Sequence, residues 1–206
     1  MSDLHNLEAF QLDVLKEVGN IGAGNAATAL SKLMSRPVDM QVPHVNLLPF
    51  EEIIEMLGGS EQTVLTIYLR VTGDSPGNMF FLLTQNSAKK LLKNLAGMES
   101  DNAEQFSEME LSALNEIGNI LAGSYLSSLA DFTKLSMSPT VPSLTIDMLG
   151  AVVSYGLMQY GEMGDKALFI DTKFLEGQDA VEAHVFFVPD PDSFGKIFRA
   201  LGVPIE

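Results

Sequence analysis

One segment of this chain occurs twice, and the second copy begins 99 residues after the first. The first copy reads Asp13-Val-Leu-Lys-Glu17-Val-Gly-Asn20-Ile, and the second reads Ser112-Ala-Leu-Asn-Glu116-Ile-Gly-Asn119-Ile. In each copy a proline, Pro43 or Pro142, follows the asparagine after a further 22 residues. A chain that repeats polar and apolar positions in one register is expected to fold as two similar half-units.

The agreement between the two halves extends beyond these polar residues. At the same offset the apolar and small residues also match, as in Leu12 and Leu111, Leu15 and Leu114, Gly19 and Gly118, Ile21 and Ile120, Ala23 and Ala122, Gly24 and Gly123, and Leu30 and Leu129. We divide the chain into half-repeats of residues 1–105 and 106–206, which meet in the polar, acidic segment Met98–Gln105. Together they should form one pseudo-symmetric domain.

The expected fold class is α/β of the α+β type. Each half reads as a long helix followed by strands that include a hairpin and then by a shorter helix. The simplest way to bury two such units is a pseudo-twofold body, in which strands of both halves form one continuous, largely antiparallel sheet and the long helices pack on it. Strand order is not determined by the sequence.

Periodicity and turn residues predict the individual elements. In the first half we expect a helix at Leu7–Met34, strands at Val38–Leu48, Thr63–Val71 and Asn78–Thr84, a turn at Gly73–Gly77, and a helix at Ser87–Leu95 that closes at Gly97. In the second half we expect a helix at Phe106–Phe132, strands near Leu144–Met148, Ala151–Tyr160, Ala167–Leu175 and Ala183–Val188, and a last helix at Asp192–Leu201.

Composition narrows the range of functions. The 206 residues are 46% hydrophobic and carry a net charge of −15, with 12 basic residues in no long cluster, so nucleic-acid binding is not expected. The first residues, Met1 to Glu8, lack the basic and apolar regions of a signal peptide, so none is expected, and no apolar run reaches the roughly 18 residues of a membrane span. Absence of cysteine fits a cytoplasmic protein without disulfides.

The repeated polar residues share one face of each long helix. At about 100° per residue, Asp13, Glu17, Asn20 and Gly24 project within roughly 60° of one another, and the second helix repeats this stripe with Ser112, Glu116, Asn119 and Gly123. Solvated residues diverge freely after a duplication, yet these match as well as the apolar ones. The two stripes are therefore expected to be docking faces.

Three glycines inside the first helix, Gly19, Gly22 and Gly24, need an explanation of their own. A helical glycine costs about 1 kcal/mol relative to alanine. Close packing against the sheet would explain some of them, and close approach of a partner's backbone would explain others. The sequence leaves both explanations open, with packing slightly favoured.

The paired Glu and Asn have complementary chemistry. Asparagine carries a donor and an acceptor, so it can hold a water molecule and contact an anionic oxygen at once. A carboxylate would repel a phosphate but can pair with a lysine beside it. Together they suit a surface that positions water for attack on a phosphoryl group while it grips a nearby cation.

The doubled motif, D/S-x3-E-x2-N-x22-P on two long helices, resembles that of the CheC family of chemotaxis phosphatases, and the resemblance spans nearly the whole chain. It implies a hydrolase that removes the aspartyl phosphate of the response regulator CheY. Asn20 and Asn119 would each orient the attacking water, and Glu17 and Glu116 would each pair with the regulator's lysine. Asp13, Ser112, Pro43 and Pro142 would support them.

The same resemblance implies the partners and the cofactor. The chain itself would need no cofactor, because the Mg²⁺ ion would belong to the regulator. The receptor deamidase CheD would be a second partner, and the protein would act in the cytoplasm. Neither copy departs from the motif, so both sites are expected to be competent. The repeat positions 22 and 121 differ, however, with Gly22 in one copy and Leu121 in the other, so equal activities are not expected.

Two other functions compete with a phosphatase, namely a binding module and a metal site. The middle domain of the flagellar switch protein FliM has a similar duplicated fold and binds without catalysis, although such a module would have little reason to keep both Glu/Asn pairs. Asp13, Glu17 and Asn20 could contribute oxygens to a Mg²⁺ or Ca²⁺ site if other elements completed it. The isolated histidines His5, His44 and His184 show no catalytic or metal-binding spacing and are expected to be ordinary.

Overall fold

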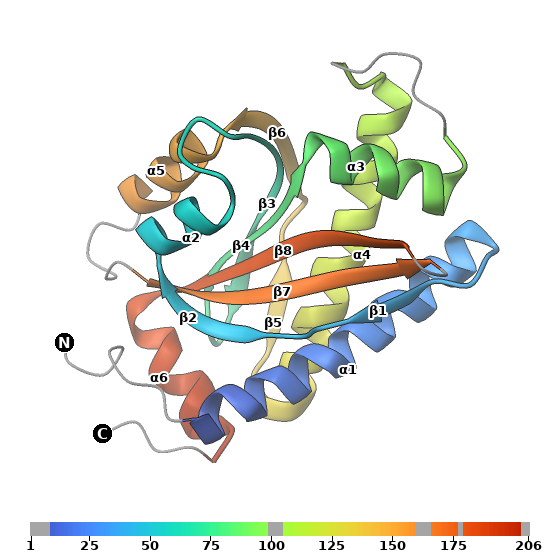
Figure 1. Cartoon of the computed structure of the whole chain (residues 1–206). Helices are drawn as coiled ribbons and strands as arrows, with labels where there is room; N and C mark the ends of the chain where they lie inside the picture. The colour runs from blue at the N-terminus through green and yellow to red at the C-terminus, as the bar shows by residue number, and fades with distance from the viewer. Residues whose placement is uncertain (1–8, 99–104, 160–165, 177–178, 203–206) are drawn as a thin grey trace.

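The computed structural model of the chain describes residues 9–98, 105–159, 166–176 and 179–202 (Figure 1). The elements of the first half are α1 (Ala9–Met34), β1 (Asp39–Gln41), β2 (Val45–Pro49), α2 (Phe50–Met56), β3 (Thr63–Gly73), β4 (Gly77–Thr84), α3 (Gln85–Leu91) and the π-helical turn η1 (Leu92–Ala96). The second half contains α4 (Glu108–Thr133), β5 (Met137–Pro139), β6 (Ser143–Met148), α5 (Leu149–Gln159), β7 (Lys166–Glu176), β8 (Asp179–Pro189) and α6 (Pro191–Ala200).

Within the described residues, eight strands form one antiparallel sheet that joins the two halves. Strands β4 and β8 pair at its centre, and each is flanked by its hairpin partner, β3 or β7. The short strands then cross between halves, because β1 and β2 pair with β7 while β5 and β6 pair with β3. This arrangement confirms the expected duplicated, antiparallel fold and supplies the strand order that the sequence left open.

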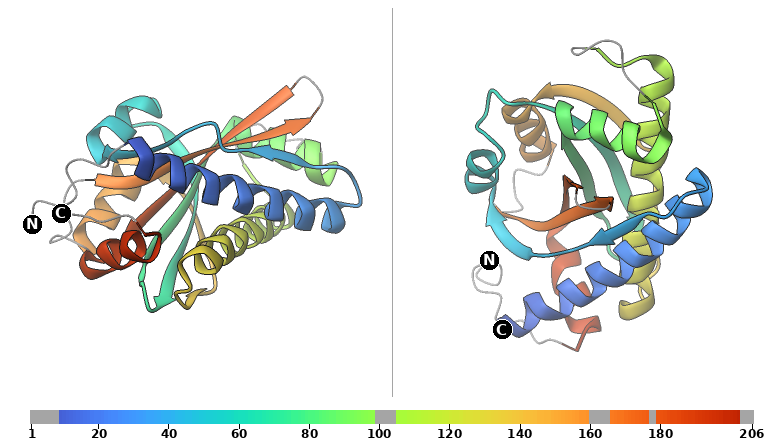
Figure 2. Two further views of the ribbon diagram at one scale, coloured as in Figure 1. Left: turned by 90° about the horizontal axis from the view of Figure 1, so that it is seen from below. Right: turned by 45° about the vertical axis from the view of Figure 1, so that its right-hand side comes forward.

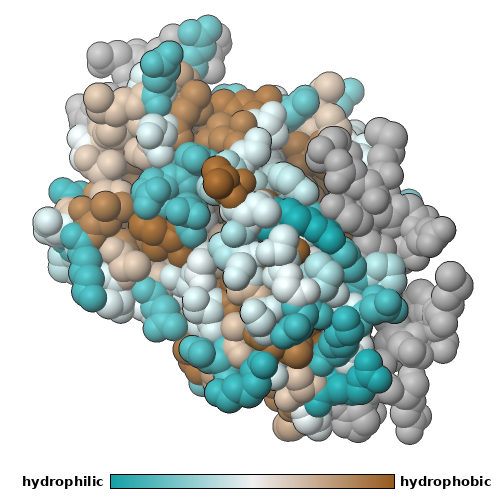
Figure 3. Space-filling model, turned by 180° about the vertical axis from the view of Figure 1, so that it is seen from behind, coloured by the Kyte–Doolittle hydropathy of each residue, from teal (hydrophilic) through white to brown (hydrophobic). Residues whose placement is uncertain are grey.

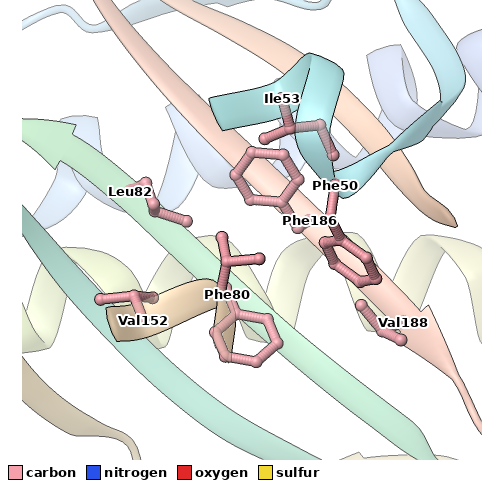
Figure 4. A pocket seen from close by; sticks show the side chains of 8 residues that line it. Phe50, Ile53, Phe80, Leu82, Val152, Phe186 and Val188 are labelled. Atoms are coloured by element: carbon pink, nitrogen blue, oxygen red, sulfur yellow. The ribbon is translucent and has the colours of Figure 1, made fainter. Parts of the chain in front are cut away.

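The sheet has a helical layer on each face (Figures 1 and 2). The larger core lies between one face and helices α1, α4, α3 and α6, with Leu65, Ile67, Phe81 and Leu83 pointing toward the helices. Alternate residues of the same strands, such as Phe80 and Leu82, point to the opposite face, where α2 and α5 pack. Figure 4 shows this smaller core, whose side chains surround a cavity of about 30 Å³.

Two expectations about this smaller layer were wrong. The segment Ala151–Tyr160, expected to be a strand, lies almost wholly in helix α5, and Tyr160 is outside the described residues. Its counterpart α2 was missed. Both segments are short, and each helix begins directly after a strand, α5 after β6 and α2 after β2. Their helical state depends on packing against the sheet, which no local pattern reports.

Other boundaries agree with the expectation or shift slightly. The strand expected at Val38–Leu48 is divided into β1 and β2, and the turn at Gly73–Gly77 joins β3 to β4 as expected. Gly97, with a φ of 64°, ends the η1 turn. The start of the first helix before Ala9 and most of the segment Met98–Gln105 are outside the described residues.

Helices α1 and α4 cross at Gly22. A Cβ atom on Gly22 would lie 2.7 Å from Cδ1 of Tyr125 and 3.1 Å from its Cα, which only glycine avoids. Near the crossing, Asn25 Nδ2 donates to Ser128 Oγ at 3.2 Å. Packing therefore explains Gly22, although its neighbour is the other long helix and not the sheet. Around Gly24, by contrast, no described atom comes within 4 Å of an added Cβ.

This contrast gives a stability prediction of opposite signs on one helix. We expect Gly22→Ala to lower the free energy of unfolding by about 1–3 kcal/mol, since the clash includes backbone. Gly24→Ala is expected to raise it by about 0.5–1 kcal/mol, because alanine lowers the entropy of the unfolded chain at no steric cost. Urea denaturation of both variants measures the difference, and equal shifts would contradict the crossing described above.

Tyr125 predicts how stability changes at alkaline pH. Its hydroxyl lies 3.0 Å from Thr172 Oγ1 on β7, and burial raises the pKa of Tyr125 to about 12, despite the hydrogen bond with Thr172 that lowers it. The unfolded chain ionises this group near pH 10, so its contribution is complete below pH 10 and is lost as pH rises toward 12. A loss of roughly 2–3 kcal/mol is expected over that range.

The matched control is Tyr125→Phe, which removes only the ionisable hydroxyl. Between pH 8 and 12, the unfolding free energy of the wild type should fall relative to that of the variant by this same amount. Parallel curves would mean that Tyr125 does not couple to folding in this way.

Among the described helices, none is both long enough and apolar enough to cross a membrane.

Candidate functional site

Both predicted stripes lie on the surface of their helices. On α1, Asp13, Glu17 and Gly24 are exposed and Asn20 is half-buried. On α4 the equivalent Ser112, Glu116 and Asn119 are exposed, while Gly123 is half-buried. The next residues along each stripe, Ala27 and Leu126, are buried. Each polar face is therefore limited to the first half of its helix.

The start of α4 shows how the sequence sets this helix in place. Ser107 Oγ accepts a hydrogen bond from the backbone N–H of Glu110, and Glu110 Oε2 accepts one from the N–H of Ser107 at 2.7 Å. This reciprocal pair is a capping box, which satisfies two helix-end donors. It determines where α4 begins, a few residues before Ser112 and Glu116.

The motif proline lies in a β-bulge in both halves. Gln41 faces Lys173 and Val45 faces Ile170, so three residues of the β1–β2 connection oppose two residues of β7. In the second half, Pro139 faces Val71 and Ser143 faces Tyr68, which again sets three residues against two. Proline suits this place because a bulge leaves one residue out of the ladder, and proline has no N–H to pair.

The first bulge contacts the candidate site directly. The N–H of Val42, the residue before Pro43, donates a hydrogen bond to Asn20 Oδ1 at 3.1 Å. This contact links the two ends of the motif and orients the Asn20 amide. A carbonyl oxygen has two lone pairs, so Oδ1 can still accept from water while the NH₂ group donates outward.

The second site is built differently at the same point. Val141, the equivalent of Val42, is 88% exposed, whereas Val42 is 2% exposed. In the part of the chain that the structure describes, Asn119 has no hydrogen bond that corresponds to the one between Asn20 and Val42. The two motifs thus share sequence, helix face and bulge, but the asparagine is restrained in the first site and open in the second.

The described side chains do not support a metal site at Asp13, Glu17 and Asn20. Among the described residues, no three Asp, Glu or His side chains lie close enough together to hold a metal ion. Asp13 and Glu17 sit one turn apart on the exposed helix face, and no described acidic side chain from another element joins them there.

His5 is outside the described residues, and the exposed His44 follows Pro43 in the first bulge. His184 on β8 faces Asp171 on β7, with Nδ1 and Oδ1 3.4 Å apart, and its ring stacks on Phe169. Burial alone would raise the pKa of Asp171, but the nearby imidazole of His184 and the charge of Lys173 bring it below its ordinary value. This pair belongs to the sheet, in the paired strands β7 and β8.

The structure also shows two features that sequence reasoning missed. The Val42 N–H contact was not foreseen, although the fixed spacing from Asn to Pro was a signal that the two ends of the motif meet. A groove beside Ser112 and Glu116, lined by apolar side chains from α1, η1 and α4, was not foreseen at all. Its residues come from three distant segments, so no local pattern could have revealed it.

Comparison with known proteins places these features in context. A family model described as the CheC-like family matches the chain twice, at residues 10–47 and 109–146. The CheY-P phosphatase CheC of Bacillus subtilis (strain 168) is 44% identical over 209 residues, which cover 100% of both chains.

Two solved structures share the fold. The crystal structure of Thermotoga maritima FliY matches with a TM-score of 0.75 at 20% identity, over 95% of this chain and 98% of that chain. A chain in the crystal structure of the FliM–SpeE complex from H. pylori matches with a TM-score of 0.70 at 15% identity, over 96% and 97% of the two chains.

The two ranges matched by the family model coincide with the two sites. Each range holds most of one long helix, the bulge with its proline, and most of the strand that follows the bulge. The doubled unit recognised in the sequence is therefore the same unit that the comparison finds twice.

Proposed function

The chain belongs to the CheC-like family, and we propose that it is a phosphatase that hydrolyses the aspartyl phosphate of the response regulator CheY. The full-length identity of 44% to a protein named as a CheY-P phosphatase supports this activity. Fold similarity alone does not, since FliY and the FliM–SpeE complex share the architecture at 20% identity or less.

The observation that carries the proposal is that two Glu/Asn pairs lie at the surface, with Asn20 half-buried and the other three residues exposed, each pair one turn apart on a helix and close to a proline bulge. A protruding helix face can enter the shallow site around a phosphorylated aspartate, where a buried pocket could not. The proposed chemistry uses water and the groups of the partner.

In the proposed reaction Asn20 or Asn119 holds a water molecule in line with the phosphorus atom. The water oxygen attacks phosphorus, and the bond between phosphorus and the aspartyl oxygen breaks. The carboxylate of the regulator is the leaving group, and the phosphoryl group is released as inorganic phosphate. The Mg²⁺ ion that offsets the charge of the phosphoryl group would be the regulator's own. This chain supplies position and hydrogen bonds.

Glu17 and Glu116 have a different role in this proposal. A carboxylate beside the phosphoryl group would repel it, but the same carboxylate can accept a charge-assisted hydrogen bond from the regulator's lysine. The side chain of Glu lies one turn before Asn on the same face, so both groups can contact one partner together. Asp13, Ser112, Pro43 and Pro142 support this arrangement.

The test is the loss of phosphate from purified, phosphorylated CheY in Mg²⁺ buffer, with and without this protein. The proposal expects acceleration at substoichiometric amounts of the protein. The competing function is a switch-type binding module, which the fold of the FliM–SpeE complex makes the natural alternative. Binding of phosphorylated CheY without faster phosphate loss would favour that module and overturn the phosphatase.

Two further proposals follow from family membership. We propose that the deamidase CheD is a second partner and that the protein acts in the cytoplasm, where CheY acts. The first is tested by mixing purified CheD with this protein and measuring their co-elution. Separate elution at micromolar concentrations of both proteins would count against it.

A further inference from the structure

A groove of about 940 Å³ lies directly beside the second Glu/Asn pair. Its walls come from the end of α1, the η1 turn and the start of α4, which lie on the same side of the molecule (Figures 1 and 2). Ser112 and Glu116 belong to this groove as well as to the candidate site. The groove is thus continuous with the face that the proposed function assigns to the regulator.

Most residues that line the groove are apolar, and two of the largest are exposed. Met109 on α4 is 70% exposed and Leu33 on α1 is 51% exposed, and Met34 and Met98 also line the groove. Large apolar side chains at this exposure contact water at a cost that burial would remove. Methionine also adapts its shape to a bound surface more readily than other apolar residues do.

The same apolar pair recurs in the other half of the chain. Phe10 is the equivalent of Met109, and Phe132 is the equivalent of Leu33, at the offset of 99 residues. Both phenylalanines are exposed. On the face seen in Figure 3, hydrophobic residues gather in clusters among hydrophilic ones. Repetition of exposed, large apolar residues at both sites indicates a shared role, since the individual residue types have changed.

Charge identifies what kind of surface fits the groove. Glu108 and Glu116 stand exposed on its α4 side, and the described lining holds no lysine or arginine. A partner surface that presents an apolar side chain next to a cation would match both the apolar lining of the groove and its two carboxylates. The cation is already present in the proposed function as the regulator's lysine beside Glu116.

We propose that the groove receives an apolar side chain of phosphorylated CheY that lies next to the lysine gripped by Glu116. Leu33 and Met109 are then binding residues of the second site, and they hold the regulator while Asn119 positions water. This inference rests on the proposed function and specifies which part of the surface provides its affinity.

The test separates the two sites by disabling one asparagine at a time. In an Asn20→Ala background, which leaves the second site, the double variant Leu33→Ser/Met109→Ser should raise KM for phosphorylated CheY about tenfold and leave kcat within twofold. In an Asn119→Ala background, which leaves the first site, the same double variant should change neither constant by more than twofold.

A matched control comes from the opposite face of the sheet. Met56 on α2 is also exposed, and Met56→Ser should leave KM unchanged in both backgrounds. Thermal unfolding of every variant checks that the exposed serines do not destabilise the fold. Because Leu33 and Met109 are solvent-exposed, their replacement is expected to shift the melting temperature little.

The outcomes distinguish this inference from the function beneath it. If the wild-type protein does not accelerate the loss of phosphate from phosphorylated CheY, the proposed function fails. If both backgrounds behave as expected but Leu33→Ser/Met109→Ser leaves KM unchanged in the Asn20→Ala background, the groove is not a binding surface. An equal rise of KM in both backgrounds would also overturn the proposal, since the effect would then not belong to the second site.

Discussion

Replacing Asn20 and Asn119 together by alanine is expected to reduce the accelerated loss of phosphate from CheY by about a hundredfold or more, to the regulator's own rate. The physical reason is the loss of the group that holds water in line with phosphorus. Each single variant should keep a partial rate, because the other helix retains its own Glu/Asn pair. Release of inorganic phosphate, measured at equal protein concentrations, gives the comparison.

The two single variants should differ in stability. Asn20→Ala removes the acceptor of the Val42 N–H bond and is expected to lower the free energy of unfolding by about 1 kcal/mol. Asn119→Ala breaks no described hydrogen bond and should cost less. Asn25→Ala serves as a control on the same helix, since Asn25 bonds Ser128 and lies off the stripe. A double variant that keeps the wild-type rate would show that asparagine does not position the water.

The second large effect is expected from Glu17→Gln combined with Glu116→Gln. Losing the charge-assisted hydrogen bond to the regulator's lysine at both sites should lower kcat/KM by about ten- to a hundredfold. The dependence of kcat/KM on ionic strength should also become weaker. Salt screens the attraction between these carboxylates and the regulator's lysine, and the double variant lacks that attraction. Steady-state rates at low and high salt measure both changes.

The control keeps the same change of net charge. Glu51 and Glu55 lie exposed on α2, across the sheet from the long helices, so Glu51→Gln/Glu55→Gln removes two charges away from both sites. We expect little loss of kcat/KM from that pair. Similar losses from the two double variants would mean that overall charge, and not contact with a lysine, drives recognition.

Much of the architecture followed from the repeat. Matching of the two halves predicted two long helices and one shared sheet, and α1 and α4 occupy nearly the expected residues. The apolar and polar periods of a helix are local properties, so they can be recognised without knowing the neighbours. For the same reason the faces that carry Glu17 and Glu116 were predicted correctly as exposed.

The errors arose where the neighbour decides the structure. Helix α5 was expected to be a strand because Ala151-Val-Val is rich in residues that favour strands. This segment is a helix that packs on the face of the sheet opposite to α4. Strand β1 was expected to continue into β2, but the bulge at Val42 and Pro43 interrupts it. Neither feature can be read locally, since a bulge exists only relative to the partner strand.

The roles of the glycines also had to await the tertiary structure. Gly22 and Gly24 are two residues apart and look alike in the sequence, but only Gly22 meets the backbone of Tyr125. Helical periodicity places them on different faces, and the position of the second helix decides which one is packed. The sequence indicates that each glycine destabilises the helix, but it does not indicate at which glycine close packing compensates for this cost.

By itself, the sequence of this protein determined that one polar motif occurs twice and that the residues of each copy share one face of a helix, because repetition and helical period are both properties of the chain alone. Tertiary structure decided how the ends of each motif meet. Pairing of β2 with β7 brings the Val42 N–H to Asn20, while the equivalent Val141 remains in solvent. Two nearly identical motifs thus become two different sites, since hydrogen bonds and burial depend on strands that lie far away in the chain.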